Sequence, residues 1–207
     1  MTQIRVAPIR RDEALRLIVE HHYLHRKSAV SYAFGLEQEG KTVGVVIFGT
    51  PASRHLQMGA CPTEPGLVVE LNRLWVSDAM PRNTESWFIA RALALLPPLI
   101  VVSYADTRQG HMGVVYRAAN FRYAGWTDME RPMARLDYLT PGKHTRDAFR
   151  GGDGANSVKV RRKPKVKYWT VTGDARARRR LTKLCGWPVM CWKKNPPPTD
   201  HKQLGVP

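Results

Sequence analysis

The sequence has few cysteines and no long apolar run. Its three cysteines, Cys61, Cys185 and Cys191, contain no CxxC pair, which argues against a disulfide framework and against a cysteine zinc site. No stretch approaches eighteen consecutive apolar residues, and residues 1–5 lack the apolar region of a signal peptide. We therefore expect an intracellular, cytoplasmic protein that has no membrane partner.

Acidic residues are also scarce, and above all in the last third of the chain. Residues 1–141 hold 16 Lys and Arg against 13 Asp and Glu, whereas residues 142–207 hold 17 against 4. This excess predicts a face that binds a nucleic acid, with double-stranded DNA as the partner, because neutralised phosphates release counterions. A solvated basic tail is the alternative. The predicted contacts are Arg161, Arg162, Lys163, Lys165, Lys167, Arg178, Arg179, Arg180, Lys193 and Lys194.

Hydrophobic patterning predicts an α/β protein with a central mixed sheet flanked by helices. Strands near 67–76 and 99–104 are each followed by a helix, so we expect them to be parallel neighbours. The predicted organisation is a core over residues 1–139, a Gly-rich linker over 140–157, a basic strand-helix-strand extension over 158–195 that completes the fold, and a disordered tail over 196–207. The last strand of the extension is expected at Pro188–Trp192.

One stretch, residues 99–126, carries the strongest site prediction. An apolar run ends in Ser103-Tyr104-Ala105-Asp106, which brings polar groups to the carboxyl end of a strand, where open α/β sheets bind ligands. A short helix is expected over His111–Asn120. Asp106 and Tyr116 would then face each other across one crevice, as members of an active site. Structural roles are the alternatives, with Asp106 as a loop cap and Tyr116 as a core residue.

Three further positions are candidates for chemistry. Arg73 lies on a strand that is expected to be central, where a charge needs a partner or a ligand. Ser86 lies in the first turn of a helix, where its hydroxyl could reach either the backbone or a ligand. His22, Tyr23 and His25 could together approach a metal, although no neighbouring carboxylate accompanies them. A loop that lines the substrate site or contacts nucleic acid is the alternative for this segment.

Residues 113–125 resemble the final helix-strand motif of the GNAT acyltransferase superfamily, in which a tyrosine is often the general acid. The predicted order of strands and helices also matches that architecture. The chain departs from the family pattern at residues 78–86, where the glycines of the pyrophosphate-binding loop are missing. This departure puts ordinary coenzyme A binding in doubt.

Five segments in order resemble a narrower group, the Mom family of bacteriophage DNA-modification proteins. They are His22-Tyr23, Glu70–Trp75, Asn83–Ser86, Ser103–Asp106 and Gly110–Phe121. The resemblance implies that the protein converts adenine in DNA to N6-carbamoylmethyladenine, which protects phage DNA from host restriction. It also implies catalytic roles for Arg73, Ser86, Asp106 and Tyr116, and substrate-binding roles for His22, Tyr23, Asn72, Tyr104 and Asn120.

Those implied roles fit the chemistry of adenine. Its exocyclic amine is a poor nucleophile, so Asp106 would accept or position its proton while Tyr116 protonates a leaving group. Arg73 would grip a carboxylate, carbonyl or phosphate. The base must leave the duplex, and Tyr104, Trp75 and Tyr23 are candidates for stacking on it.

The cofactor is left open by the sequence. The added group is joined through a methylene, so a glycine-derived donor is conceivable, carried by glycyl-tRNA or by coenzyme A, and tRNA would then be a second partner. The family resemblance also suggests iron at His22, Tyr23 and His25. Two other functions remain as alternatives, an ordinary N-acyltransferase of a small amine or protein, and a non-catalytic DNA-binding anti-restriction protein.

Overall fold

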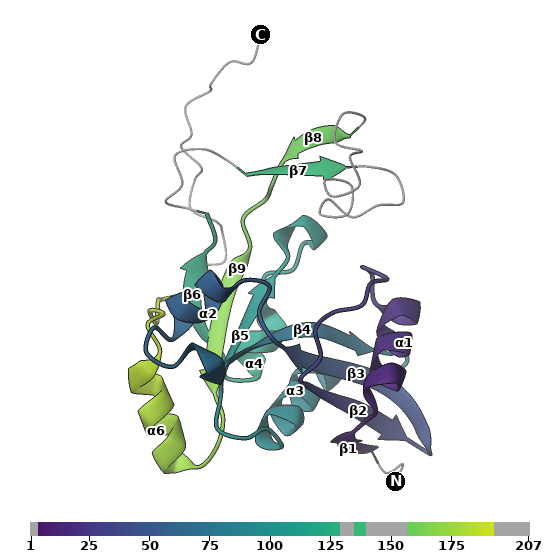
Figure 1. Ribbon diagram of the computed structural model, residues 1–207. Helices are drawn as coiled ribbons and strands as arrows, with labels where there is room; N and C mark the ends of the chain where they lie inside the picture. The colour runs from purple at the N-terminus through teal and green to yellow at the C-terminus, as the bar shows by residue number, and fades with distance from the viewer. Residues whose placement is uncertain (1–3, 129–134, 140–156, 193–207) are drawn as a thin grey trace.

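A seven-stranded mixed sheet forms the centre of the computed structural model, which describes residues 4–128, 135–139 and 157–192 (Figure 1). The strand order is β1-β2-β3-β4-β5-β9-β6. This architecture confirms the α/β class predicted from the sequence. The strands are β1 (Ile4–Pro8), β2 (Tyr32–Gln38), β3 (Lys41–Gly49), β4 (Val68–Val76), β5 (Ile100–Ala105), β9 (Val166–Val171) and β6 (Arg122–Trp126).

Strands β1 to β4 form an antiparallel meander, and β4 and β5 are parallel neighbours, as predicted. Strand β9 then lies between β5 and β6 and is antiparallel to both. Its Tyr168 and Trp169 are both fully buried, on opposite faces of the sheet. The basic C-terminal part of the chain therefore supplies an interior strand of the sheet.

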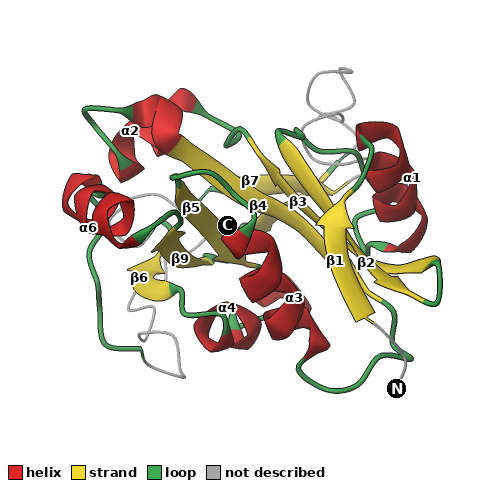
Figure 2. Cartoon of the chain, turned by 90° about the horizontal axis from the view of Figure 1, so that it is seen from below, coloured by secondary structure: helices red, strands yellow, loops and turns green. Residues whose placement is uncertain are grey.

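Helices cover both faces of the sheet (Figure 2). Helix α1 (Arg11–His21) buries Ala14, Leu17 and Ile18, whose spacing gives the helix one apolar side. The same face carries α2 (Arg54–Ala60) and α6 (Ala175–Leu184), which pack around Trp169. The opposite face carries α3 (Thr84–Ala94) and α4 (Val114–Ala118).

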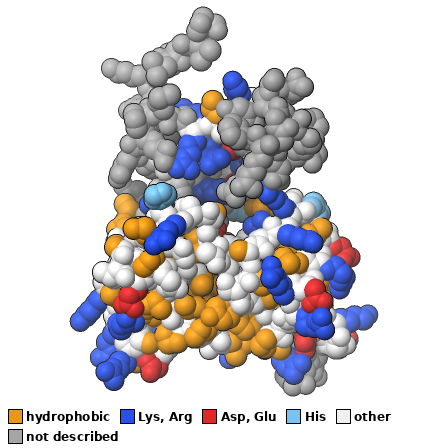
Figure 3. Space-filling model, in the orientation of Figure 1, with side chains coloured by type: hydrophobic (Ala, Val, Ile, Leu, Met, Phe, Trp, Pro, Cys, Tyr) orange, Lys and Arg blue, Asp and Glu red, His pale blue; other side chains and the backbone are white. Residues whose placement is uncertain are grey.

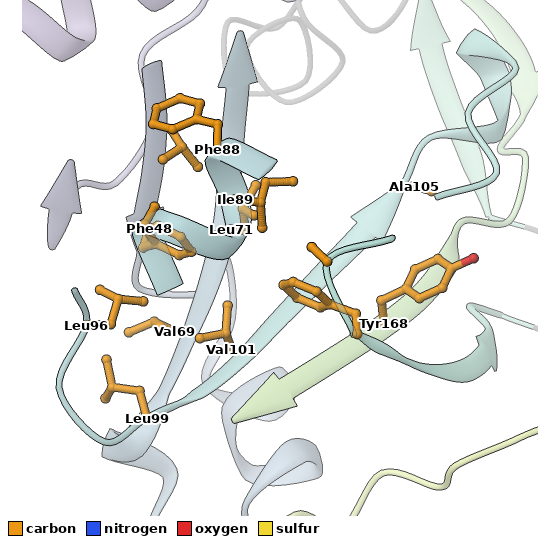
Figure 4. Close-up of a cluster of buried hydrophobic side chains, with 14 of the residues drawn as sticks. Phe48, Val69, Leu71, Phe88, Ile89, Leu96, Leu99, Val101, Ala105 and Tyr168 are labelled. Carbon is orange, nitrogen blue, oxygen red and sulfur yellow. The ribbon is translucent and has the colours of Figure 1, made fainter. Parts of the chain in front are cut away.

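The largest core cluster lies beneath α3 (Figure 4). Phe88 and Ile89 of α3 pack there against Phe48, Leu71 and Val101 of the sheet. All five side chains are buried. This packing fixes β4 and β5 relative to α3, and so fixes the frame on which the candidate site is built.

Two predicted elements differ in the structure. The helix expected over His111–Asn120 is the shorter α4, because Gly113 adopts a left-handed backbone with φ of 75° immediately before it. Pro188–Trp192 is not a strand: Pro188 has no N–H, and the segment makes one backbone hydrogen bond to β6, from Met190 N–H to the Tyr123 carbonyl at 2.9 Å.

Outside the main sheet, β7 (Leu136–Leu139) and β8 (Val158–Arg161) form a two-stranded antiparallel ribbon (Figure 1). Residues 140–156 of the predicted linker, the predicted tail 196–207 and the two lysines Lys193 and Lys194 lie outside the described residues. Within the described ranges, the helices are too short or too polar to cross a membrane.

Candidate active site

Strands β4 and β5 separate where the candidate residues gather. They pair only from Val68 to Glu70 on β4 and from Ile100 to Val102 on β5. Beyond these points β4 continues its pairing with β3, while β5 continues with β9. Polar side chains from both faces of the sheet can therefore meet between the two strands, which is where parallel sheets commonly bind ligands.

Asp106 follows β5 directly and caps a short 3₁₀ turn over Thr107–Gln109. Its Oδ1 accepts a hydrogen bond from the Arg108 N–H at 3.0 Å, and its Oδ2 lies 3.5 Å from the Nζ of Lys165. The Thr107 hydroxyl donates to the Pro164 carbonyl at 2.6 Å. The turn is thus tied to the segment that leads into β9. Asp106 fills the structural role considered for it, and its second oxygen remains directed at a cation.

His22 and Tyr23 follow α1 and stack with ring centroids 4.3 Å apart. His22 is 7% exposed, and its Nδ1 accepts a hydrogen bond from the Leu24 N–H at 3.1 Å. Burial, and next the positive charge of Arg73, lower the pKa of His22 to about 4. The imidazole is therefore neutral at pH 7 and carries its proton on Nε2.

Tyr23 interacts electrostatically with Asp106, which connects the His22–Tyr23 pair to that carboxylate. Burial is the largest of the effects that raise the pKa of Tyr23 to about 12. The negative charge of Asp106 and the nearby Tyr116 act in the same direction, while Arg73 opposes the shift. The ring also lies edge-on to His111, with centroids 5.9 Å apart. The phenol thus stays protonated at neutral pH and lies within electrostatic range of the Asp106 carboxylate.

Tyr116 reaches the same region from α4. Its ring packs against Phe121 and Tyr168, with centroids 5.5 and 5.6 Å away. Burial raises the pKa of Tyr116, and a hydrogen bond with Ser103 opposes that shift. The phenol is therefore a proton donor at neutral pH, as the sequence-based assignment of an acid requires.

Arg73 is half-buried on β4. Its Nη1 donates to the Asn72 carbonyl at 2.7 Å, whereas its Nε is buried and has no hydrogen-bond partner within the described part of the chain. Burial lowers the pKa of Arg73, and Tyr23 and Glu70 oppose this effect. A buried donor without an acceptor is costly, so this guanidinium is suited to receive an anionic or carbonyl ligand.

Three residues near the site were absent from the predicted active site, namely Glu70, His111 and Lys165. Burial raises the pKa of Glu70, and Lys165 opposes the shift. Glu70 in turn raises the pKa of Tyr104, after the larger effect of burial. A charge on an interior strand was the sequence signal for Glu70, but nothing local placed His111 beside Tyr23 or Lys165 beside Asp106.

Three predicted site residues have their contacts elsewhere. The Ser86 hydroxyl donates to the Asn83 carbonyl at the start of α3, at 3.0 Å. The Asn72 amide donates to the Ala29 carbonyl at 2.9 Å. Asn120 lies in a groove beside α6. Their catalytic and substrate-binding roles remain predictions, whereas His22, Tyr23, Arg73, Asp106 and Tyr116 are brought together.

The structure does not support the predicted iron site. His22 uses Nδ1 to accept from Leu24, and the Nδ1 of His25 lies 2.9 Å from the Val19 carbonyl. Across the described ranges, no group of three His, Cys, Asp or Glu side chains is placed to hold a metal ion.

The predicted nucleic-acid contacts differ in their surroundings. Arg162 pairs with Asp137 across the β7–β8 ribbon at 2.7 Å, and Arg180 pairs with Glu64. Arg161, Lys163, Arg178 and Arg179 are exposed. Lys167 lies over the Trp187 ring at 5.5 Å. Lys and Arg side chains also gather at the level of the ribbon in Figure 3.

The fold and this site together describe an α/β protein with a carboxylate, two protonated phenols and a half-buried arginine where two parallel strands part. The profile of the Mom protein family matches residues 3–178, and the chain belongs to that family. It is 37% identical over 130 residues to the methylcarbamoylase Mom of Escherichia phage Mu. That match covers 59% of this chain and 54% of the relative, so it spans about half of the relative's length.

Solved structures align with most of the chain. An N-acetyltransferase from Staphylococcus aureus aligns with a TM-score of 0.48 at 11% identity, over 82% of this chain and 98% of that one. A GNAT-family acetyltransferase from Bacillus cereus aligns with a TM-score of 0.44 at 13% identity, over 84% of this chain and 99% of that one.

Proposed function

We propose that this protein is a transferase that modifies the N6 amine of adenine in phage DNA to N6-carbamoylmethyladenine and so protects that DNA from host restriction. The observation that carries the proposal is the pairing of Asp106 with Lys165 at the end of β5, within electrostatic range of Tyr23, in a member of the Mom family. The name of its phage Mu relative, a methylcarbamoylase, is consistent with the added group.

In the product, an N–H bond of the amine has been replaced by a bond from nitrogen to a methylene carbon. With a glycyl ester or thioester as donor, nitrogen first bonds to the carbonyl carbon and the bond from that carbon to the tRNA oxygen or the coenzyme A sulfur breaks. The resulting glycyl amide then rearranges to its isomer, the carbamoylmethyl group. The amine proton would pass to Asp106, whose Oδ2 is held beside Lys165. The leaving group of the donor would take a proton from Tyr116, which stays protonated at neutral pH. The unpartnered Nε of Arg73 would hold a carbonyl or carboxylate of the donor, for which a glycine-derived group on tRNA or coenzyme A remains the prediction.

The target amine has to leave the base stack before it can reach Asp106. Tyr23 is 43% exposed and lies within electrostatic range of the carboxylate, so it is the best placed of the predicted stacking residues. Trp75 already stacks on His21 at 4.1 Å, and Tyr104 packs edge-on to Trp187 at 6.0 Å. We therefore assign the extruded adenine to the side of the site that Tyr23 forms.

The β7–β8 ribbon supports DNA as the substrate. Lys159 and Arg161 are exposed on alternate residues of β8 and so share one face. A two-stranded ribbon has the width to enter the major groove of B-DNA. Asp137 on β7 lies 3.7 Å from Arg108 in the turn after Asp106, which connects the ribbon to the candidate site.

Nucleoside mass spectrometry of plasmid DNA from bacteria that express the protein tests the proposal. We expect a carbamoylmethyl-adenosine species with the wild-type chain and none with Asp106→Asn. Asp12→Asn is the matched control, because Asp12 is an exposed α1 residue that pairs with Arg10. Equal modification by Asp106→Asn would overturn the catalytic assignment. The positive control is the phage Mu relative, expressed in the same host. If that relative modifies the DNA while the well-expressed wild-type protein does not, the proposed reaction is overturned.

A further inference from the structure

A second cationic site lies at the other end of the sheet from Asp106. A groove between α6 and the edge strand β6 is lined by four positively charged side chains and two threonines, namely Arg122, Arg178, Arg179, Lys183, Thr170 and Thr182. No acidic side chain lines it. The groove follows the carboxyl end of β9, whereas Asp106 follows the carboxyl end of β5, which is antiparallel to β9 (Figure 1).

Arg122 is held rigidly on the floor of this groove. Its guanidinium lies over the Trp169 ring at 4.5 Å, and its Nη1 donates to the Thr182 hydroxyl at 3.1 Å. A stacked and hydrogen-bonded guanidinium loses little conformational entropy when it binds, and its remaining N–H donors match the oxygens of a phosphate. Arg122 is therefore preorganised for an anion.

The other cations of the groove lack acidic partners. Within the described ranges, no ion pair involves Arg122, Arg178, Arg179 or Lys183, whereas Arg180 on another side of α6 pairs with Glu64. Four like charges that share a groove repel one another, and a polyanion would relieve that repulsion. The hydroxyls of the two threonines add neutral hydrogen-bonding groups, which is the composition of a phosphate-binding site.

We propose that this groove binds the sugar-phosphate backbone of the DNA substrate at a distance from the modified adenine, an inference that rests on the proposed function. The β5–β9 ladder runs from Ala105 beside Val166 to Ile100 beside Val171, which spans about 17 Å at ~3.3 Å per residue. That is about half a turn of B-DNA. One duplex can therefore contact the groove while an extruded base occupies the site near Asp106.

Fluorescence anisotropy with a labelled 20-base-pair duplex, repeated over a range of salt concentrations, tests this assignment. We expect Arg178→Ala/Lys183→Ala to bind the duplex on the order of tenfold more weakly and to make the slope of log K against log salt shallower by about 2. The matched control Arg176→Ala/Lys41→Ala removes the same two residue types from outside the groove. Thermal melting of both doubles verifies that they are folded.

Equal losses in the two doubles would overturn the proposal, because they would show only a response to net charge. The groove could also bind the phosphate of a donor that contains a nucleotide, and AMP is the probe for this alternative ligand. If Arg178→Ala/Lys183→Ala abolishes AMP binding but leaves duplex binding unchanged, the proposal is also overturned. These measurements need no turnover, so their failure is distinct from a failure to detect modified adenine.

Discussion

The Nζ of Lys165 lies 3.5 Å from Oδ2 of Asp106, so a residue that precedes β9 places its charge beside the carboxylate that follows β5. Asp106 also caps its own 3₁₀ turn through Oδ1. One oxygen of the carboxylate is thus committed to the backbone, and the other faces a cation that comes from a distant part of the sequence. The candidate site is complete only when the C-terminal strand has joined the sheet.

Lys165→Met should lower the fraction of modified plasmid adenine about fivefold, since a partly exposed pair of this kind contributes up to about 1 kcal/mol. The comparison variant is Lys163→Met, which removes an exposed charge two residues away. If Lys165 acts through Asp106, its loss lowers modification with little change in duplex affinity measured by anisotropy. A loss of affinity equal to that of Lys163→Met would instead make Lys165 an ordinary phosphate contact.

Stability should fall between pH 7 and pH 5 because of His22. Its pKa is about 4 in the folded chain and 6.5 in a free side chain, so the unfolded state binds the proton first as pH falls. The expected loss is about 2 kcal/mol over this interval. Denaturant unfolding of the wild type and of His22→Gln measures it, and the variant should show a flatter pH profile. Parallel profiles would show that His22 is not buried in the neutral form.

Much of the sheet was predictable because its signals are local. Hydrophobic patterning placed β4 and β5, and the helix that follows each of these strands predicted their parallel pairing. The insertion of β9 between β5 and β6 was not predictable, because the pairing of Tyr168 with Ser103 and Tyr123 depends on contacts far apart in the sequence. The local pattern shows that a segment is extended and gives no information about which neighbour it will pair with.

The same distinction holds for the site. Asp106 was found because it ends an apolar strand, and Arg73 because a charge on a central strand needs a partner. Tyr23 was found through its histidine-rich segment and the resemblance to the Mom family. Lys165 was predicted only as a DNA contact, since its sequence neighbours are basic. Its approach to Asp106 follows from the turn that Thr107 and Pro164 hold together, which is a tertiary contact.

Tyr168→Phe should destabilise the protein by about 2 kcal/mol, because it removes two hydrogen bonds from a buried side chain. The Tyr168 hydroxyl donates to the Met112 carbonyl at 2.6 Å and accepts from the Trp192 indole at 3.0 Å. Tyr32→Phe is the control, since the Tyr32 hydroxyl has no hydrogen-bond partner among the described residues. Chemical denaturation measures both variants, and equal effects would contradict a role for the Trp192–Tyr168–Met112 chain of contacts.

Two glycines with the same backbone offer a test of how the helix that carries Tyr116 is held. Gly110 and Gly113 have φ of 74° and 75°. Alanine at either position should cost about 1–2 kcal/mol for the left-handed backbone. A Cβ at Gly110 would meet nothing within 4 Å, whereas one at Gly113 would lie 2.2 Å from Cε2 of the Tyr168 ring.

Tyr168 is fully buried and hydrogen-bonded, so it cannot move aside without repacking the core under α4. Gly113→Ala should therefore destabilise the protein by a further ~1–3 kcal/mol beyond Gly110→Ala. It should also displace Tyr116, because α4 begins at the next residue. Urea unfolding of the two variants isolates the steric contribution, since their backbone costs cancel. Equal unfolding free energies would show that Gly113 is required only for its backbone conformation, and that Tyr168 does not fix the start of α4.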